Sequence, residues 1–272
     1  PTEGVNAYLT LSRHAHAQER LRETPSSDAL EFAPDRDQAE RVIAQARQDR
    51  RTYLTWPEAR QLLRGYGFKL VGSTFDTDFE RLLTRLTPRF FPAALRLVHQ
   101  TYSYPFAYQN VPAARWRGAK IELADAAALR AASVELTREK NRRLPDSEIL
   151  GWAVQPMRRK VDAIQFSLGI TRDPTYGPLI FIGEGGSHAD MLVDRQVALV
   201  PLNSALAKQL IQKTHGYQVL LERSEQLVDD MERLIQHLIG LSQMVIDNPR
   251  LMGVEVNLLL QNNSLPVVLG VA

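Results

Sequence analysis

Apolar residues along the chain follow two periods, one typical of amphipathic helices and one typical of buried strands. Near the C-terminus, six apolar residues recur at spacings of 4, 3, 4, 3 and 4, which predicts a helix over about residues 225–246 with one apolar face. These residues are Leu227, Met231, Leu234, Leu238, Leu241 and Val245. Asn248-Pro249 ends this helix, and residues 253–260 and 266–271 are predicted to form closing strands.

Upstream of that helix, predicted helices and strands interleave. Helices are expected over about residues 5–22 and 36–50, from a capping box at Thr55 and Glu58 to Arg64, from Asp125 to residue 141, and from Ser204 onward. Strands are expected over residues 68–71, 92–98, 118–123 and 149–157, with two or three more between residues 163 and 200. This order predicts a mixed α+β (α/β) fold.

The stretch from Thr171 to Gly186 carries the clearest turn signals in the chain. Asp173-Pro174 and Gly177-Pro178 separate two apolar runs, and Gly183-Glu184-Gly185-Gly186 follows the second run. The order predicts a strand, a tight turn, a second strand and a glycine-rich loop. Backbone N–H groups of such a loop can hold a phosphate, but similar loops also simply connect strands, and both interpretations stay open at this point.

Composition excludes several classes of protein. With 44% apolar and 24% charged residues among 272, the chain is ordinary for a globular protein of one large or two moderate domains. Because it contains no cysteine, it has no disulfide framework, no cysteine-based zinc site and no thiolate nucleophile. No apolar run approaches the roughly 20 residues that span a bilayer, so we expect no membrane insertion and a cytoplasmic location. The six histidines show no metal-binding pattern.

The net charge of +2 is unevenly distributed. Between Arg81 and Arg143 there are 12 basic and 4 acidic residues, so this segment has a local charge of +8. A basic module suits a polyphosphate ligand such as a nucleotide or coenzyme A, while a solvated arginine-rich face is the structural alternative. Nucleic acid would be attracted by the same charge, but we do not predict it as a partner.

These motifs resemble the ATP-grasp segment of the NDP-forming acyl-CoA synthetases, and more closely its relative in Pat-type bacterial protein lysine acetyltransferases. The resemblance rests on the 171–186 stretch, on an entry motif with Leu54, Tyr66 and Gly67, and on residues 197–203, which follow the acetyltransferase branch. It implies an ATP-grasp-like fold with two lobes, in which mixed sheets are flanked by helices. The implied division is a helical tail of a CoA-ligase-like domain plus linker (1–52), a basic small lobe (53–153) and a C-terminal lobe (154–272).

The resemblance also implies site residues. Arg96 stands where the family has a phosphate-binding lysine, and Glu255 with Asn257 corresponds to an acidic-x-Asn signature that binds magnesium. Surface positions for these three residues are the structural alternative. The remaining residues implied to line a nucleotide site are Val154, Gln155 and Met157 beside adenine, Gln165, and the loop glycines Gly183, Gly185 and Gly186. A buried hinge strand is the alternative for residues 154–157.

Several positions depart from the family pattern. Residues 99–108 lack the His-Lys pair of active ligases, Gln165 replaces an expected glutamate, and the expected arginine is replaced near Ala198. Asn257 is followed by Leu258 instead of proline, and Gly270 stands where a second metal-binding carboxylate is expected. One glutamate and one amide offer a divalent cation few fixed oxygens. We therefore expect no catalytic residue and no phosphoryl transfer by this segment, and we treat the binding of ATP and Mg as doubtful.

The leading hypothesis is a degenerate, regulatory ATP-grasp-like segment of a protein lysine acetyltransferase. Such a parent enzyme uses acetyl-CoA to acetylate lysines on target proteins, for example acyl-CoA synthetases, through a domain outside this chain. The first alternative is the nucleotide-binding domain of an NDP-forming acyl-CoA synthetase, an acid-thiol ligase. The second is a non-catalytic module that forms homo-oligomers through its basic lobe and the 227–245 helix. Because the chain does not begin with methionine, we interpret it as a piece of a larger protein.

Overall fold

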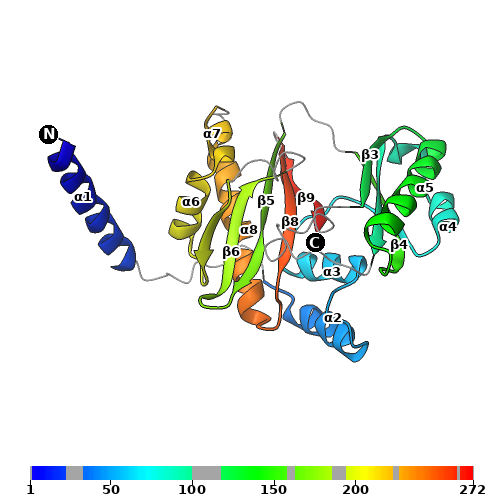
Figure 1. Ribbon diagram of the computed structural model, residues 1–272, viewed down its shortest axis with the longest axis horizontal. Helices are drawn as coiled ribbons and strands as arrows, with labels where there is room; N and C mark the ends of the chain where they lie inside the picture. Colours follow the sequence, from blue (N-terminus) through cyan, green and yellow to red (C-terminus); the bar gives the residue numbers. More distant parts are fainter. Residues whose placement is uncertain are drawn as a thin grey trace.

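The computed structural model (Figure 1) describes residues 2–22, 33–99, 118–157, 163–185, 194–222, 227–261 and 264–271. Its helices are α1 (Thr2–Arg22), α2 (Arg36–Gln48), α3 (Trp56–Gly65), α4 (Phe79–Thr84), α5 (Ala126–Arg143), α6 (Ser204–Gln212), α7 (His215–Leu221) and α8 (Leu227–Asp247), with a 3-10 turn at Pro88–Phe90. Its strands are β1 (Thr74–Asp76), β2 (Ala93–His99), β3 (Ala119–Leu123), β4 (Ile149–Pro156), β5 (Ile164–Asp173), β6 (Gly177–Glu184), β7 (Gln196–Leu199), β8 (Val254–Gln261) and β9 (Ser264–Val271).

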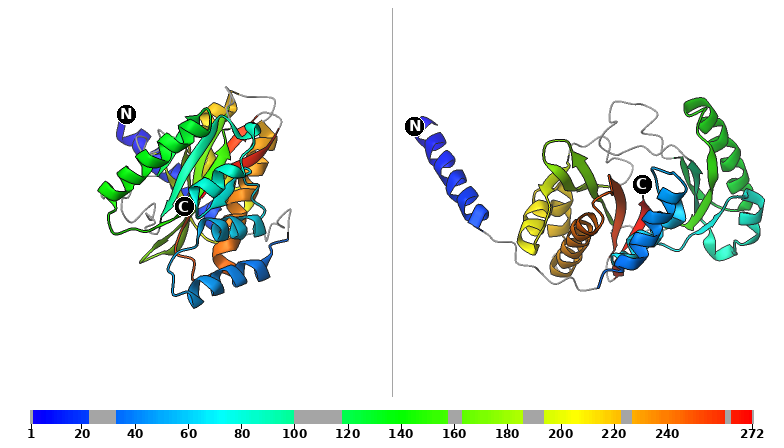
Figure 2. Two further views of the ribbon diagram at one scale, coloured as in Figure 1. Left: turned by 90° about the vertical axis from the view of Figure 1, so that its right-hand side faces the viewer. Right: turned by 90° about the horizontal axis from the view of Figure 1, so that it is seen from below.

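The described strands form two antiparallel sheets. The smaller sheet has the order β1-β4-β2-β3, and the larger has the order β7-β6-β5-β8-β9. Helices α6, α7 and α8 pack on the larger sheet, while α5 packs on β2 and β3 of the smaller one. Figures 1 and 2 show the two sheets side by side, with α1 standing apart from the rest of the chain. The expected mixed α+β fold with two lobes is confirmed.

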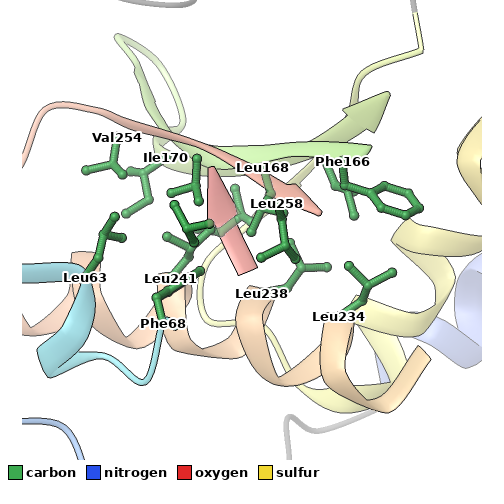
Figure 3. Close-up of a cluster of buried hydrophobic side chains, with 14 of the residues drawn as sticks. Leu63, Phe68, Phe166, Leu168, Ile170, Leu234, Leu238, Leu241, Val254 and Leu258 are labelled. Atoms are coloured by element: carbon green, nitrogen blue, oxygen red, sulfur yellow. The ribbon is translucent and has the colours of Figure 1, made fainter. Parts of the chain in front are cut away.

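The main core lies between the larger sheet and α8 (Figure 3). Alternate residues of β5, namely Phe166, Leu168 and Ile170, face this core and are fully buried. The predicted apolar face of the last helix is the face that α8 buries, with Leu234, Leu238 and Leu241 inaccessible to water. The sequence pattern at period 2 on the strand and period 3.6 on the helix thus accounts for how these layers meet.

A second core fills the space between the smaller sheet and its helices. Leu95 and Leu97 of β2 and Val154 of β4 are buried against Leu129 and Leu136 of α5. The predicted N-cap of α5 is confirmed, because the Asp125 side chain accepts the Ala128 N–H at 2.8 Å. β4 occupies an interior position in this sheet, and the predicted lobe boundary after residue 153 falls within that strand. That boundary stays a prediction.

α3 precedes the smaller sheet in sequence but packs in the core of the larger one. Leu62, Leu63 and Tyr66 join that core, as does Phe68 beyond the helix. The strand predicted over residues 68–71 does not form: Leu70 makes a single parallel bridge to Val268. The segment follows a left-handed turn at Gly67 and meets the edge of β9 only briefly, so no longer ladder develops.

The tight turn predicted after Asp173 is confirmed. The Asp173 carboxylate accepts the backbone N–H groups of Thr175 and Tyr176 at 2.8 and 3.0 Å. Gly177 has φ of +77°, a conformation that strongly favours glycine. This turn fixes the register in which Ser167 faces Gly183 and Ile170 faces Ile180.

Carboxylates partly neutralise the basic segment between Arg81 and Arg143. Asp76 is bound by Arg81 and also by Arg85, and these bonds hold the pKa of the carboxyl group well below its usual range. Arg130 pairs with Glu80 at 2.9 Å. Asp76 and Glu80 precede residue 81, so a charge count that begins at Arg81 overstates the local positive charge.

Two histidines are withdrawn from water. His237 of α8 is half-buried with its ring edge-on to Phe68, and burial lowers its pKa. His99, at the end of β2, has a pKa lowered to about 4, chiefly by burial and further by the positive charges of Arg96 and Lys140. Both imidazoles are therefore neutral in the folded chain near pH 7.

A core substitution in α8 should cost much more stability than a surface one. Leu238→Ala removes a fully buried side chain and leaves a cavity, so we expect a loss of about 2–5 kcal/mol in the free energy of unfolding. Val228→Ala, on the exposed side of the same helix, is the matched control and should change little. Urea denaturation measures both; equal effects would contradict the described packing of α8.

Stability should fall when the pH is lowered from 7 to 5. The pKa of His99 is lowered in the folded chain relative to about 6.5 unfolded, so below pH 6.5 the unfolded chain binds more protons and is favoured. The same sign holds for His237. We expect the midpoint of urea denaturation to drop over this range, and the drop to shrink in His99→Gln. His215→Gln is the exposed control; an unchanged pH dependence in His99→Gln would contradict the effect.

Candidate functional site

The face of the larger sheet opposite α8 carries polar residues, and we call it the polar face. It is defined by Gln165, Ser167, Gly169, Glu255 and Asn257, which alternate with the core-facing residues of β5 and β8. Ser167 lies directly opposite Asn257 in the ladder, and Gly169 lies opposite Glu255. The predicted metal residues Glu255 and Asn257 therefore share one face, as residues two apart on a strand should.

Glu255 is buried and already has two partners. Its Oε1 atom accepts the Ser167 hydroxyl at 2.6 Å and lies 3.3 Å from Nη2 of Arg195. Arg195 comes from the segment just before β7, and its guanidinium also lies over the Phe181 ring, 4.9 Å from the ring centroid. Glu255 is thus already paired with a cation that the chain itself supplies.

Asn257 differs from Glu255 because its Oδ1 atom is buried and accepts no hydrogen bond from any residue that the structure describes. Gly270 of β9 is its direct neighbour across the ladder. The position where the resemblance leads one to expect a second carboxylate is therefore adjacent to Asn257, as a shared cation would require, but it carries no side chain. A buried oxygen without a partner is costly unless a ligand group satisfies it.

Arg96, the predicted phosphate residue, lies on β2 of the smaller sheet with its guanidinium 5.1 Å from the ring centroid of Trp56. Arg60 contacts the same indole at 5.5 Å. Arg60 is buried, with Nη2 donating to the Val71 carbonyl at 2.6 Å, while Nη1 has no hydrogen-bond partner among residues 33–99 or the other described ranges. Burial and the nearby Arg64 lower the pKa of Arg60 to about 10. Two guanidiniums therefore gather around one tryptophan where the two lobes meet.

The predicted adenine neighbours lie at the end of β4, where the chain leaves the smaller sheet. Gln155 pairs with Ala94 and lies on the same face as Arg96, whose ladder partner is Ala153. Val154 points the other way into the core against α5, so only its backbone remains for a ligand. The Met157 N–H donates to the Pro92 carbonyl at 2.8 Å, which fixes the exit from the strand.

The glycine-rich loop has a structural explanation at two of its positions. A Cβ atom on Gly183 would come within 2.9 Å of the Asp194 carbonyl oxygen, and one on Gly185 within 2.7 Å of the Phe166 backbone. Close backbone packing thus accounts for both glycines, and the Gly185 N–H donates to the Gln165 carbonyl. Gly186 and the predicted departure at residues 100–108 lie outside the described residues.

Sequence reasoning missed four residues that shape these sites: Trp56, Arg60, Ser167 and Arg195. Trp56 and Arg60 lie one turn apart in α3, but the contacts of Trp56 with Arg96 and of Glu255 with Ser167 and Arg195 join segments that are distant in sequence, so local patterns do not reveal them. One signal was present: Arg195 immediately precedes the strand in which the expected family arginine is missing near Ala198.

The donor set does not fit a divalent cation. Glu255 and Asn257 supply one carboxylate and one amide oxygen, whereas Mg²⁺ demands octahedral oxygen coordination and Ca²⁺ still more ligands. Arg195 would repel a cation at Glu255, because a guanidinium stays charged in proteins. Among the described residues, no three His, Asp or Glu side chains cluster in a way that could hold a metal ion.

Within the same described residues, no helix is long and apolar enough to cross a membrane.

Comparison with known proteins shows which proteins this chain resembles in sequence. Over 262 residues the chain is 23% identical to the ADP-forming acetate–CoA ligase I of Archaeoglobus fulgidus. The matched region covers 94% of this chain and 35% of that protein. It is also 23% identical over 208 residues to the β subunit of ADP-forming acetate–CoA ligase II from Pyrococcus furiosus, covering 76% of this chain and 82% of the subunit. The chain thus spans about a third of the Archaeoglobus relative and most of the Pyrococcus subunit.

Solved structures share the fold. PH1788 from Pyrococcus horikoshii has a TM-score of 0.69 at 21% identity, covering 87% of this chain and 97% of that one. The dinucleotide-forming acetyl-coenzyme A synthetase 1 of Ca. Korarchaeum cryptofilum, solved with coenzyme A and Ca-AMPCP, has a TM-score of 0.67 at 20% identity, covering 86% and 97%.

The resemblance to the ATP-grasp segment of NDP-forming acyl-CoA synthetases is confirmed by these relatives, whereas the closer affinity to protein lysine acetyltransferases stays a prediction. A sequence profile described as the ATP-grasp domain matches residues 45–272, most of the chain. The chain therefore belongs to the ATP-grasp domain family.

Proposed function

We propose that this chain is the nucleotide-binding unit of a protein related to the ADP-forming acyl-CoA synthetases, and that its ligand is ATP. The observation that carries the proposal is the polar face, where the buried Oδ1 atom of Asn257, beside Glu255, has no hydrogen-bond partner within the described part of the chain. A buried polar atom left unsatisfied is destabilising, and its retention favours a ligand-binding role. The acyl-CoA ligase relatives support the choice of parent protein.

The phosphates of ATP would be bound through guanidinium groups. Arg96 is the candidate from the smaller sheet, and its contact with Trp56 orients the plane of its guanidinium group. Among the described contacts, none pairs Arg96 with a carboxylate. Arg60 lies on the same indole and adds positive charge. A guanidinium offers several donors in a planar fork, which matches the oxygens of a phosphate group.

The base would lie beside the end of β4, where Gln155 and Met157 leave the smaller sheet. The Gln155 side chain shares a face with Arg96, so one ligand with a base and a phosphate tail could contact both residues. An amide side chain both donates and accepts hydrogen bonds, as the edge of adenine requires. Val154 contributes apolar core packing behind this strand.

A second candidate function is a regulatory ATP-grasp-like segment of a protein lysine acetyltransferase. The observations that favour it are the Arg195–Glu255 ion pair and the glycine at residue 270, which together leave the polar face without a set of free carboxylates. Under this alternative the segment would sense acetyl-CoA or another ligand while an acetyltransferase domain elsewhere acts on target proteins. Binding of ATP with micromolar affinity would count against it.

Isothermal titration calorimetry of the full chain with ATP in MgCl₂ tests the proposal. We expect saturable binding with a dissociation constant of order micromolar, and we expect Arg96→Ala to weaken it about 10–100-fold, because a charge-assisted hydrogen bond is lost. Arg250→Ala removes the same charge from an exposed turn and is the matched control. Unchanged affinity in Arg96→Ala would contradict the role of Arg96, and absence of any binding would contradict the function itself.

A further inference from the structure

We infer that Arg195 takes the place of a divalent cation on the polar face, so that this chain binds the polyphosphate of ATP without a bound metal ion. The inference rests on the proposed nucleotide-binding function and specifies its ligand as the uncomplexed anion. It starts from the disagreement between the donor set and the magnesium site that the resemblance implies.

The first step is that packing against an aromatic ring fixes the position of Arg195. Gly169 of β5 pairs with Phe181 of β6 on one side and with Glu255 of β8 on the other. Because Gly169 lacks a side chain, the Phe181 ring lies against it: a Cβ atom there would come within 2.8 Å of the ring. The guanidinium of Arg195 then stacks over this ring, 4.9 Å from its centroid.

The second step is that this stacking aims the positive charge at Glu255. Nη2 of Arg195 lies 3.3 Å from Oε1, which also accepts the Ser167 hydroxyl at 2.6 Å. Both partners are largely buried, with side-chain exposures of 20% and 11%. A buried carboxylate needs a compensating positive charge, and here the chain itself supplies that charge.

The third step is that the polar face has lost the second carboxylate that would offset a divalent ion. Gly270 pairs with Asn257, and neither residue carries charge. With Arg195 counted, Glu255, Asn257 and residue 270 sum to zero charge before any ligand binds. A metal ion here would be repelled by the positive charge of Arg195, whereas a phosphate oxygen would be attracted to that charge.

Titration of ATP in the presence of EDTA tests the inference. We expect the wild-type dissociation constant in EDTA to lie within about threefold of that in MgCl₂, and Arg195→Gln to weaken metal-free binding by about tenfold or more, as expected when one charge-assisted contact is lost. Arg250→Gln is the matched control and should bind like the wild type. Each variant is first compared with the wild type in thermal unfolding, so that a folding defect is recognised.

A second variant tests the same idea by gain of function. Arg195→Gln combined with Gly270→Asp removes the internal cation and places a carboxylate next to Asn257. This double variant should bind ATP more tightly in MgCl₂ than in EDTA, in contrast to the wild type. It keeps the inference testable if the single variant is poorly folded.

The outcomes separate the inference from the proposed function. Wild-type binding in MgCl₂ that is lost in EDTA would overturn the inference and leave the nucleotide-binding function standing. Metal-free binding that Arg195→Gln does not weaken would overturn the role of Arg195 alone. Absence of binding in both buffers would overturn the nucleotide-binding function and the inference with it.

Discussion

The core and the polar face of the larger lobe both depend on one constraint, the alternation of side chains along β5 and β8. Phe166, Leu168 and Ile170 meet α8 on one face, and the residues between them form the polar face on the other. Shifting the register by one residue would exchange the two sets and bury Glu255 against leucines. The turn capped by Asp173 fixes the register of β5 against β6, the strand on its other side, so the same alternation continues across that pairing.

Short-range patterns in the sequence were sufficient to predict α8, the Asp125 cap and the turn at Asp173, since each depends on residues only a few positions apart. The same reasoning predicted a strand at residues 68–71 that does not form and missed β1, α4 and α7, which are too short to show a period. At the site, the shared face of Glu255 and Asn257 followed from spacing. Their partners did not, because Arg195 reaches Glu255 only through the fold, 60 residues away in sequence.

The polar face is specified separately from the core, because the core lies on the opposite side of the same strands. Glu255, Asn257 and Gly270 are not part of the core that α8 covers, so replacing them removes no contact of that core. Gly169 is an exception, since the approach of the Phe181 ring and of the Val254 carbonyl leaves no room for a side chain. One glycine therefore links the backbone geometry of β5 to the charge on the polar face.

Trp56 connects the two lobes through a single side chain. Its indole belongs to the core of the larger lobe, yet it contacts Arg96 on the smaller sheet. Attraction between a cation and an aromatic face requires that the charge lie over the ring within about 6 Å of its centroid, whereas a hydrogen bond also weakens steeply as its angle departs from linear. Trp56 therefore joins the two lobes through a contact that depends less sharply on angle than a hydrogen bond does, and such a contact tolerates small differences in how the lobes are oriented.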